Sequence, residues 1–263
     1  RQPKVLFPLL GRTLVSRVLD AAGEAGCGEQ IVVVGFGADM VRTELGDNVQ
    51  YAVQEGMQGT GQAVAAARAA TDFRNRTVII LPGDVPLISA GSLRQLLSSH
   101  QSNGSTVTVM TMKPDDATGY GRVIRHEDNE HVIRIVEHRD ANKEELAVKE
   151  SNTSIYAVSG NFLFGEDGQG GALAQLTTDN DQGEYLLTDI VAIATENGEP
   201  VRAFILSDKS EVAGINDRMQ LAALETELKA TINEAWMRKG VSMDNPQDTR
   251  IEEGVTLARD VVL

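Results

Sequence analysis

The chain has 263 residues and a formal net charge of −14 at pH 7, and this acidic balance argues against a general nucleic-acid or anionic-membrane surface. Its single cysteine, Cys27, excludes an internal disulfide framework and a cysteine-based zinc site, and it fits a reducing cytosol. Because no apolar run approaches the roughly 18 residues of a membrane span and no signal peptide is visible, we expect a cytoplasmic protein without membrane or nucleic-acid partners.

Helical and strand periods alternate along the first part of the chain. Apolar residues from Leu14 to Ala22 keep the spacing of one helix face, and the apolar run 31–34 follows as a buried strand. Such alternation is typical of βα units around a parallel sheet. The elements expected in this part are helices at 14–22, 62–70 and 92–100 and strands at 31–34, 49–53 and 78–81.

The middle of the chain changes to alternating apolar and polar residues, which predicts antiparallel strands flanking the parallel core. The elements expected here and beyond are antiparallel strands at 107–111, 121–125 and 132–137, helices at 184–196 and 217–238, and a strand at 201–206. The predicted fold class is therefore α/β, with a Rossmann-like domain built on a mixed, mostly parallel sheet.

The last residues have a six-residue apolar period. Ile251, Leu257 and Leu263 recur at this spacing, and Val255 and Val261 repeat it. The period is typical of a parallel β-helix, and the alternative is an unstructured tail with chance spacing. The predicted divisions are a main domain at 1–226, a linker helix and connection at 227–250, and the first β-helix coils at 251–263.

The apolar strand expected at 78–81 leads into Pro82-Gly83-Asp84. An all-apolar strand is typical of a parallel sheet that is buried on both faces, and ligands bind beyond the carboxyl ends of such strands. Gly83 permits a close approach of the backbone to a ligand. Asp84 is therefore well suited to hold Mg²⁺ over a nucleotide, and the alternative is a residue that caps a helix or loop.

Three further features suit phosphate or base binding, although the local sequence leaves each one open. Gly59-Thr60-Gly61 precedes a helix, so its N–H groups can face an anion or a base, or can form a plain turn. Gln54 has an amide that can pair with a nucleobase, and Lys4 is either a phosphate ligand or a solvated side chain. All four histidines, His100 among them, lie in polar or helix-end contexts, so we expect them at the surface and expect no catalytic histidine.

An ordered set of motifs spans almost the whole chain. The eight motifs are Lys4-Val5-Leu6, Gln54 with Gly59-Thr60-Gly61, Gly83-Asp84-Val85-Pro86-Leu87, Thr118-Gly119-Tyr120-Gly121-Arg122, Val136-Glu137, Asn152-Thr153, Gln182-Gly183-Glu184-Tyr185 with Thr188-Asp189, and Glu211-Val212-Ala213-Gly214-Ile215-Asn216. Together they resemble the uridyltransferase domain of the bacterial bifunctional N-acetylglucosamine-1-phosphate uridyltransferase/glucosamine-1-phosphate acetyltransferase. Single motifs are shared with other sugar-phosphate nucleotidyltransferases, whereas the combination with the terminal hexapeptide signal is more specific.

The resemblance implies roles for particular residues. Asp84 and Asn216 match the two ligands of a catalytic Mg²⁺, a hard cation that prefers oxygen ligands, and Lys4 matches a lysine that neutralises the nucleotide phosphates. The positions that match the uracil-reading residues are Gln54, Gly59 and Thr60. The positions that match the wall around the acetamido sugar are Gly121, Glu137, Asn152 and Thr153, with Asn152 also near the ribose.

The implied reaction makes UDP-N-acetylglucosamine and pyrophosphate from UTP and N-acetylglucosamine 1-phosphate, for peptidoglycan and lipopolysaccharide precursors. A phosphate oxygen of the sugar phosphate attacks the α-phosphorus of UTP in line, and pyrophosphate leaves. Because this nucleophile is already an anion, no general base is required. Two alternatives are kept: a nucleotidyltransferase for another sugar 1-phosphate or nucleotide, and a non-catalytic scaffold or regulatory subunit.

The chain departs from the family pattern at several points. The family begins with Leu-Ala-Ala-Gly-x-Gly-Thr-Arg-Met, a strand and glycine-rich loop not found here, so we expect a fragment that is a poor catalyst. After Glu137 the family often has x-Lys-Asp, whereas this chain has His138-Arg139-Asp140, which keeps the charge and changes its geometry. The family also implies a homotrimer with acetyltransferase activity for the full-length protein, and we expect a monomer or weak dimer for these 263 residues.

Overall fold

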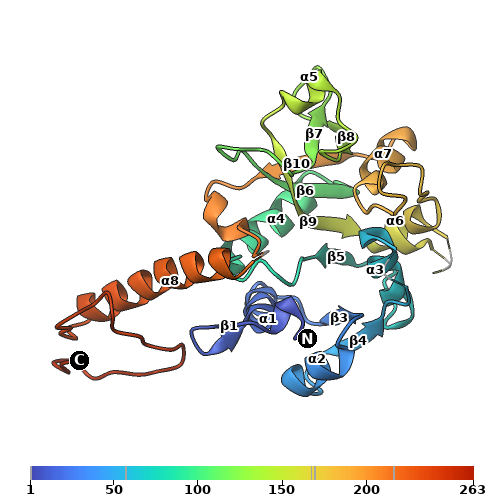
Figure 1. Ribbon diagram of the computed structural model, residues 1–263. Coiled ribbons are helices and arrows are strands. Elements are labelled where there is room, and N and C mark those ends of the chain that lie inside the picture. Colours follow the sequence, from blue (N-terminus) through green and yellow to red (C-terminus); the bar gives the residue numbers. More distant parts are fainter. Residues whose placement is uncertain (1, 57, 167, 169, 216) are drawn as a thin grey trace.

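The computed structural model describes residues 2–56, 58–166, 168, 170–215 and 217–263. Its centre is a six-stranded mixed sheet, and two-stranded sheets lie beside it (Figure 1). The strands are β1 (Pro8–Leu9), β2 (Arg12–Thr13), β3 (Ile31–Val34), β4 (Gln50–Val53), β5 (Thr77–Ile80), β6 (Val107–Met112), β7 (Arg122–Arg125), β8 (Val132–Val136), β9 (Ser151–Ser159) and β10 (Val201–Ile205). The helices are α1 (Leu14–Glu24), α2 (Ala38–Leu45), α3 (Thr60–Ala66), α4 (Ala90–Ser102), α5 (Lys143–Leu146), α6 (Gly160–Phe164), α7 (Asp189–Glu196) and α8 (Arg218–Arg238), and short 3₁₀ helices include η1 (Lys4–Leu6) and η4 (Lys209–Val212).

The large sheet has the strand order β10-β6-β9-β7-β8, and β5 pairs with β9 outside this path. β10 runs parallel to β6, whereas β9 is antiparallel to β5, β6 and β7, and β8 is antiparallel to β7. It follows that β5, β6, β7 and β10 point in one direction while β8 and β9 point in the other. The predicted α/β class with a mixed sheet is confirmed. Four of its six strands point in one direction, but β10 and β6 form the one parallel pair described in this sheet, so its pairing is mostly antiparallel.

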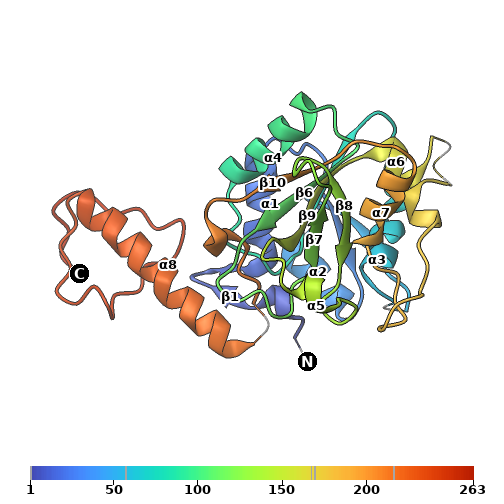
Figure 2. The same ribbon diagram turned by 90° about the horizontal axis from the view of Figure 1, so that it is seen from above.

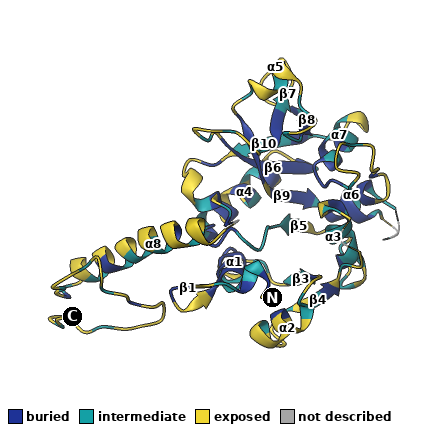
Figure 3. Ribbon diagram, in the orientation of Figure 1, coloured by how far each residue is buried: buried dark blue, intermediate teal, exposed yellow. Residues whose placement is uncertain are grey.

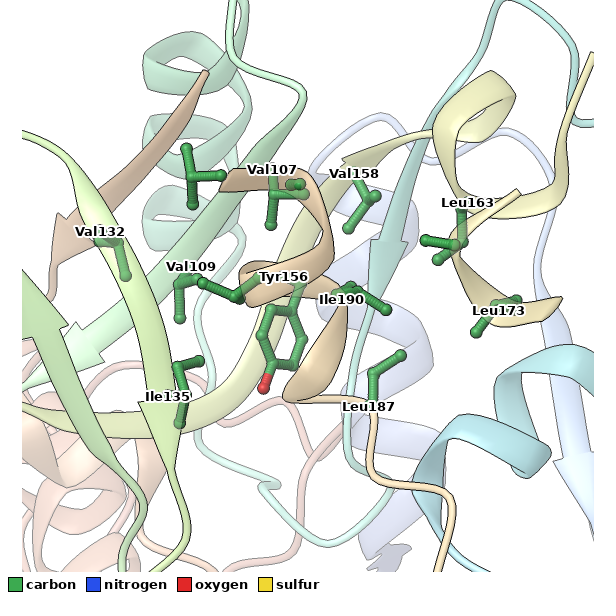
Figure 4. Close-up of a cluster of buried hydrophobic side chains, with 14 of the residues drawn as sticks. Val107, Val109, Val132, Ile135, Tyr156, Val158, Leu163, Leu173, Leu187 and Ile190 are labelled. Carbon is green, nitrogen blue, oxygen red and sulfur yellow. The ribbon is translucent and has the colours of Figure 1, made fainter. Parts of the chain in front are cut away.

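Helices cover both faces of the large sheet (Figure 2). On one face, α1 and α4 pack on β6 and β9, where Leu96 and Ile155 are completely buried. On the other face, α6 and α7 pack on the sheet around Tyr156, Leu163 and Ile190 (Figure 4). Burying a large apolar side chain contributes about 1.5–3 kcal/mol, so these two layers stabilise the sheet that carries the site. Figure 3 shows that this buried region is continuous along the central strands.

β6 is buried along its whole length, which differs from the flanking strand that its alternating sequence predicts. The reason is its place between β9 and β10 with helices on both faces. Its buried hydroxyls are paired, because Thr108 Oγ1 lies 3.0 Å from His100 Nδ1 and Thr111 Oγ1 donates to Glu150 at 2.7 Å. His100 is thus buried, and the expectation of a surface histidine is wrong at this position.

β3 and β4 form a separate parallel pair beside the large sheet. The burial predicted for β3, and the burial on both faces predicted for β5, are not observed, since Ile31 to Val33 and Val78 to Ile80 are only half-buried. Both strands line one large cavity, which leaves part of their apolar surface without protein contacts. These strands therefore form walls of a cavity.

The helix predicted at 184–196 begins at Asp189 instead. The residues before it are used in another contact, because Tyr185 N donates to Gln58 O at 2.8 Å and Tyr185 O accepts from Gly61 N at 2.8 Å. Because the N–H and the carbonyl of Tyr185 make these bonds to a distant turn, they cannot also make the backbone hydrogen bonds of a helix. The Gln182-Gly183-Glu184-Tyr185 motif is consequently a docking segment for the start of α3.

α8 projects from the body of the molecule and runs unbroken across the predicted boundary at residue 226 (Figure 1). It starts at an N-cap, Asp217, whose carboxylate accepts from Met219 N and Gln220 N at 2.8 Å. Neither α8 nor any other helix in the described part of the chain is both long and apolar enough to cross a membrane.

Residues 251–263, all of which are described, form no strand beyond an isolated bridge between Ser242 and Val262. The β-helix coils predicted there are therefore not observed. A coil of that kind is stable only where neighbouring coils bury its apolar face. Instead, Ser242 N donates to Val261 O at 2.8 Å, so the segment packs against the connection that follows α8, and Glu253 pairs with Arg17 at 2.7 Å near the N-terminal hairpin.

Candidate active site

A cavity of about 1700 Å³ collects most of the polar residues singled out by the sequence. It is bordered by β3 and β5 and extends to β9. Gln54 follows β4 and Asp84 follows β5, so both lie beyond carboxyl ends of strands, where α/β folds bind ligands. The predicted site residues that line the cavity are Gln54, Thr60, Asp84, Glu137, Asn152 and Thr153.

Asp84 forms an ion pair with Lys4 at the edge of this cavity. Lys4 Nζ lies 2.5 Å from Asp84 Oδ2, and the two side chains are 36% and 24% exposed. A Cβ on Gly83 would lie 3.2 Å from Val5, so the missing side chain lets η1 approach the Asp84 loop closely. Since the pair is partly hydrated, it contributes little to stability.

The donor type at Asp84 fits a hard cation such as Mg²⁺, which binds one or two carboxylates and takes its other ligands from phosphates and water. Asn216, the predicted second ligand, lies outside the described residues. Its neighbour Ile215 donates its backbone N–H to Asp84 O at 3.2 Å. Within the described ranges, no group of three or more His, Cys, Asp or Glu side chains is placed to hold a metal ion.

The turn before α3 requires glycine. Gly59 has φ +108°, and a Cβ there would lie 2.5 Å from the carbonyl oxygen of Tyr185. The next residue continues this contact, because Thr60 Oγ1 accepts from Leu187 N at 3.0 Å. Two motifs that are far apart in the sequence therefore form one rigid wall of the cavity.

Gln54 lies inside the same wall. Its Nε2 donates to Gly59 O at 3.0 Å and to Gln62 Oε1 at 3.1 Å. These bonds use both amide hydrogens within the turn. Recognition of a base by Gln54 would therefore use its carbonyl oxygen, with the side chain already oriented.

The opposite wall is built around Asn152, which is 5% exposed. Asn152 Nδ2 donates to Tyr156 Oη at 2.7 Å, and its backbone N–H donates to Gly121 O at 2.9 Å. A Cβ on Gly121 would lie 3.6 Å from each carboxylate oxygen of Glu137, so the glycine leaves the carboxylate unobstructed on that side. The structure thus brings together Gly121, Glu137 and Asn152, three positions that the family resemblance assigns to one wall.

Acidic groups in this wall repel one another. Burial raises the pKa of Glu137, and the charges of Asp140 and Asp189 raise it further, against a hydrogen bond from Thr188. Thr188 Oγ1 donates to Glu137 Oε1 at 3.3 Å. Burial, together with the charge of Asp140, also raises the pKa of Asp189. The wall therefore favours a ligand that can donate hydrogen bonds to Glu137.

Thr153 has a structural contact in addition to its place at the cavity. Its Oγ1 donates to Met110 O at 2.7 Å, inside a β-bulge where the β6–β9 register shifts. The bulge places Ser154 at φ +62°. Such bulges re-aim side chains beside functional sites, so Thr153 helps to orient the preceding Asn152.

Sequence reasoning gave no role to Tyr156 and none to Thr188 beyond its motif. Both line the cavity, and both hydrogen-bond to predicted site residues. Tyr156 lies four residues after Asn152 on β9, and the bulge at Thr153 and Ser154 interrupts the period-two pattern that would have connected the two positions. Thr188 lies just before α7 and could not be placed while a longer helix was expected there.

The fold and the cavity define an α/β protein whose polar residues gather beyond strand ends, as in nucleotide-binding proteins of this class. A family model described as Nucleotidyl transferase matches residues 1–240, and the chain belongs to this family. The family resemblance inferred from the motifs is confirmed by this match and by the following relatives.

Three curated relatives carry the name "Bifunctional protein GlmU". The protein of Exiguobacterium sibiricum is 42% identical over 260 residues, which cover 99% of this chain and 56% of the relative. The protein of Caldanaerobacter subterraneus subsp. tengcongensis is 42% identical over 263 residues, covering 100% and 56%. The protein of Corynebacterium efficiens is 41% identical over 267 residues, covering 99% and 54%. The chain thus spans about half the length of the curated relatives it matches.

A solved structure described as UDP-glucose pyrophosphorylase complexed with UDP-glucose has the same fold. Its TM-score is 0.66, with 90% of this chain and 91% of that chain covered. The identity of 15% makes this a likeness of fold alone.

Proposed function

We propose that this chain transfers a uridylyl group from UTP to N-acetylglucosamine 1-phosphate, giving UDP-N-acetylglucosamine and pyrophosphate. Membership of the nucleotidyl transferase family and the similarity to proteins named GlmU support a sugar-phosphate uridyltransferase. The substrate pair is the one that the resemblance of the motifs implies. The observation that carries the proposal is the shared cavity, because Asp84, Thr60 and Asn152 border the same space from separate walls.

Each wall has its own task in this proposal. The turn at Gly59 and Thr60, with Gln54 oriented beside it, offers backbone groups and a carbonyl oxygen to the edge of uracil. Lys4 neutralises charge on the nucleotide phosphates. Glu137 and Asn152 hold the acetamido sugar, since a carboxylate accepts hydrogen bonds from sugar hydroxyls and an amide matches an amide.

The chemistry consists of one displacement at phosphorus. A bond forms between a phosphate oxygen of the sugar phosphate and the α-phosphorus of UTP, and the bond to the β-phosphate oxygen breaks with release of pyrophosphate. The nucleophile is already anionic, so no side chain has to remove a proton from it. The residues of this chain therefore act by positioning and by charge neutralisation. Mg²⁺ held by Asp84, with Asn216 as the proposed second ligand, would supply further charge neutralisation between the phosphates.

The test is pyrophosphate release from UTP and N-acetylglucosamine 1-phosphate by the natural full-length protein and its Asp84→Asn variant. We expect kcat/KM to fall by about 100-fold or more, because the substitution keeps the shape of the side chain and removes its charge. Asp115→Asn is the matched control, because this substitution makes the same change of charge at a surface carboxylate that is 94% exposed. A variant at Asp84 that keeps a normal rate contradicts the proposal.

The choice of sugar separates the proposal from its nearest alternative. Glucose 1-phosphate leaves the groups that bind the acetamido arm unpaired, which lowers kcat/KM by about tenfold to 100-fold. Comparable values for the two sugars would indicate a nucleotidyltransferase for another sugar phosphate. Absence of turnover with every nucleotide and sugar phosphate would indicate a scaffold or regulatory role.

A further inference from the structure

We propose that Glu211 is a positioning residue that fixes the segment 209–215 on the loop carrying Asp84. The inference rests on the proposed function, in which Asp84 holds the metal of the metal–nucleotide substrate. Glu211 is not among the described residues that line the cavity, whereas Val212 and Gly214 of its segment are, so its effect reaches the substrate through the segment and through Asp84. Two sets of contacts, one at each end of the segment, hold it on this loop.

At the first end, the carboxylate of Glu211 holds the first turn of α4. Its Oε2 accepts from the backbone N–H of Ser89 at 2.8 Å, and its Oε1 accepts from Ser92 Oγ at 3.0 Å. Ser89 is the N-cap of α4, and its own Oγ accepts from Ser92 N at 3.1 Å. A carboxylate is favoured at a helix N-terminus because it faces the positive end of the helix dipole. Both carboxylate oxygens are therefore committed to the end of the Asp84 loop.

At the second end, Ile215 N donates to Asp84 O at 3.2 Å. Ile215 itself is 1% exposed, in a cluster with residues of α1 and α8. Between the two ends, Val212 is 3% exposed and belongs to the same apolar cluster as Val85 and Ile88 of the Asp84 loop. The segment and the loop thus lie together along their whole length.

The hydrogen bonds at the two ends of the segment differ in strength. The bonds of Glu211 are charge-assisted, and hydrogen bonds of that kind are about twice as strong as neutral ones. The bond of Ile215 is a single neutral bond beside Gly214, whose Cβ position meets no atom within 4 Å. Loss of the Glu211 contacts therefore lets the Ile215 end open more often and releases the backbone of Asp84.

Hydrogen exchange at the Ile215 amide measures this opening directly, and binding of Mn²⁺ with UTP measures its consequence at Asp84. We expect Glu211→Ala to speed Ile215 exchange by about tenfold and to weaken Mn²⁺–UTP binding by a similar factor. Glu211→Gln should restore both within about threefold, because its carbonyl oxygen can accept from Ser89 N and its amide can donate to Ser92 Oγ.

Lys209→Ala is the matched control in the same 3₁₀ helix. It breaks the ion pair of Lys209 with Asp115, whose side chains are 47% and 94% exposed, so both measurements should stay unchanged. If Glu211→Ala does not fold, Ser92→Ala removes one of the two carboxylate bonds from the α4 side and should move both measurements in the same direction.

The outcomes separate this inference from the proposed function. If Asp84→Asn abolishes Mn²⁺–UTP binding while Glu211→Ala and Ser92→Ala leave it unchanged, the positioning role is wrong and the function stands. If Asp84→Asn itself binds Mn²⁺–UTP normally, the proposed function is wrong. Equal effects of Lys209→Ala and Glu211→Ala would also overturn the inference, because the anchoring would then not be specific to the hydrogen bonds of the side chain at position 211.

Discussion

At the scale of single residues, the burial of His100 makes the stability of the folded protein depend on pH. It lies in the last turn of α4 at 5% exposure, and its Nδ1 is 3.0 Å from Thr108 Oγ1. Burial lowers the pKa of His100, because the charged imidazolium is poorly solvated there. Below about pH 6.5 the His100 imidazole is protonated in the unfolded chain, whereas in the folded protein it stays neutral until the pH reaches its lowered pKa. The resulting contribution to stability is present above that pH and is lost as the pH falls through the lowered folded pKa.

We therefore predict that His100→Gln lowers the free energy of unfolding at pH 7.5 by about 1–2 kcal/mol, through the lost contacts with the sheet. The variant should also lose less stability than the wild type between pH 7.5 and 5.5, because the titrating group is gone. Urea unfolding at the two pH values measures both effects. His126→Gln is the control, since the His126 side chain is 60% exposed, and an equal flattening in that variant would contradict the argument.

At the scale of secondary structure, β9 organises the site. It pairs with β5, β6 and β7, and it carries Asn152 and Tyr156 into the cavity wall. Its start is fixed by Glu150, whose carboxylate accepts from Arg125 Nε and Nη2 and from Thr111 Oγ1, each at 2.7 Å. Burial alone would raise the pKa of Glu150, but the hydrogen bonds of Arg125 and Thr111 outweigh it and lower that pKa.

We predict that Glu150→Ala lowers the free energy of unfolding by about 3 kcal/mol at pH 7, because it leaves the Arg125 charge largely buried without its partner. The paired side chains of Arg125 and Glu150 are only 17% and 8% exposed. Breaking the pair of Arg238 and Glu234, which are 76% and 59% exposed, should change stability by less than about 0.5 kcal/mol. Chemical denaturation of Glu150→Ala and of Glu234→Ala measures the free energy of unfolding of each variant. Equal losses in the two variants would show that burial of the Arg125 pair is unimportant.

At the scale of the whole molecule, the cavity depends on walls from distant parts of the chain. The β3–β4 pair and β5 border one side and β9 borders the other, and the segment before α7 is bonded to the turn before α3. α8 and residues 239–263 lie to one side of this arrangement (Figure 2). Exposed large apolar side chains on the described surface, such as Phe36, Met219 and Val262, come from different elements.

We predict that the 263-residue chain of 28.3 kDa sediments as a monomer or weak dimer at micromolar concentration. Residues 251–263 form no β-helix coil here that could associate with other copies, and scattered apolar residues rarely form a stable interface. Deleting residues 251–263 should leave the sedimentation coefficient nearly unchanged. A stable trimer of the chain would show that the α/β domain itself drives association.

Much of the fold could be predicted from residue periods. The strands at β3, β4, β5 and β10 and the helices α1, α4 and α8 lie close to their predicted ranges, because each has a local pattern that matches its environment. β9 was not predicted, since its Ser-Asn-Thr-Ser start is polar and its strand conformation depends on pairing with three other strands. The β-helix coils predicted at 251–263 are not observed, because a six-residue period states which residues could be buried and supplies no neighbour to bury them.

By itself the sequence determined the α/β class, the placement of Asp84 after a strand and the glycine at position 59, since these follow from local apolar runs and allowed backbone angles. Only the tertiary structure decided that Gly59 faces Tyr185, that Asn152 is held by Tyr156, and that Glu211 joins α4 to the Asp84 loop. Such contacts join residues that are distant in sequence or that lie on one face of a strand not predicted in advance. Their geometry depends on how whole elements pack, which no local pattern specifies.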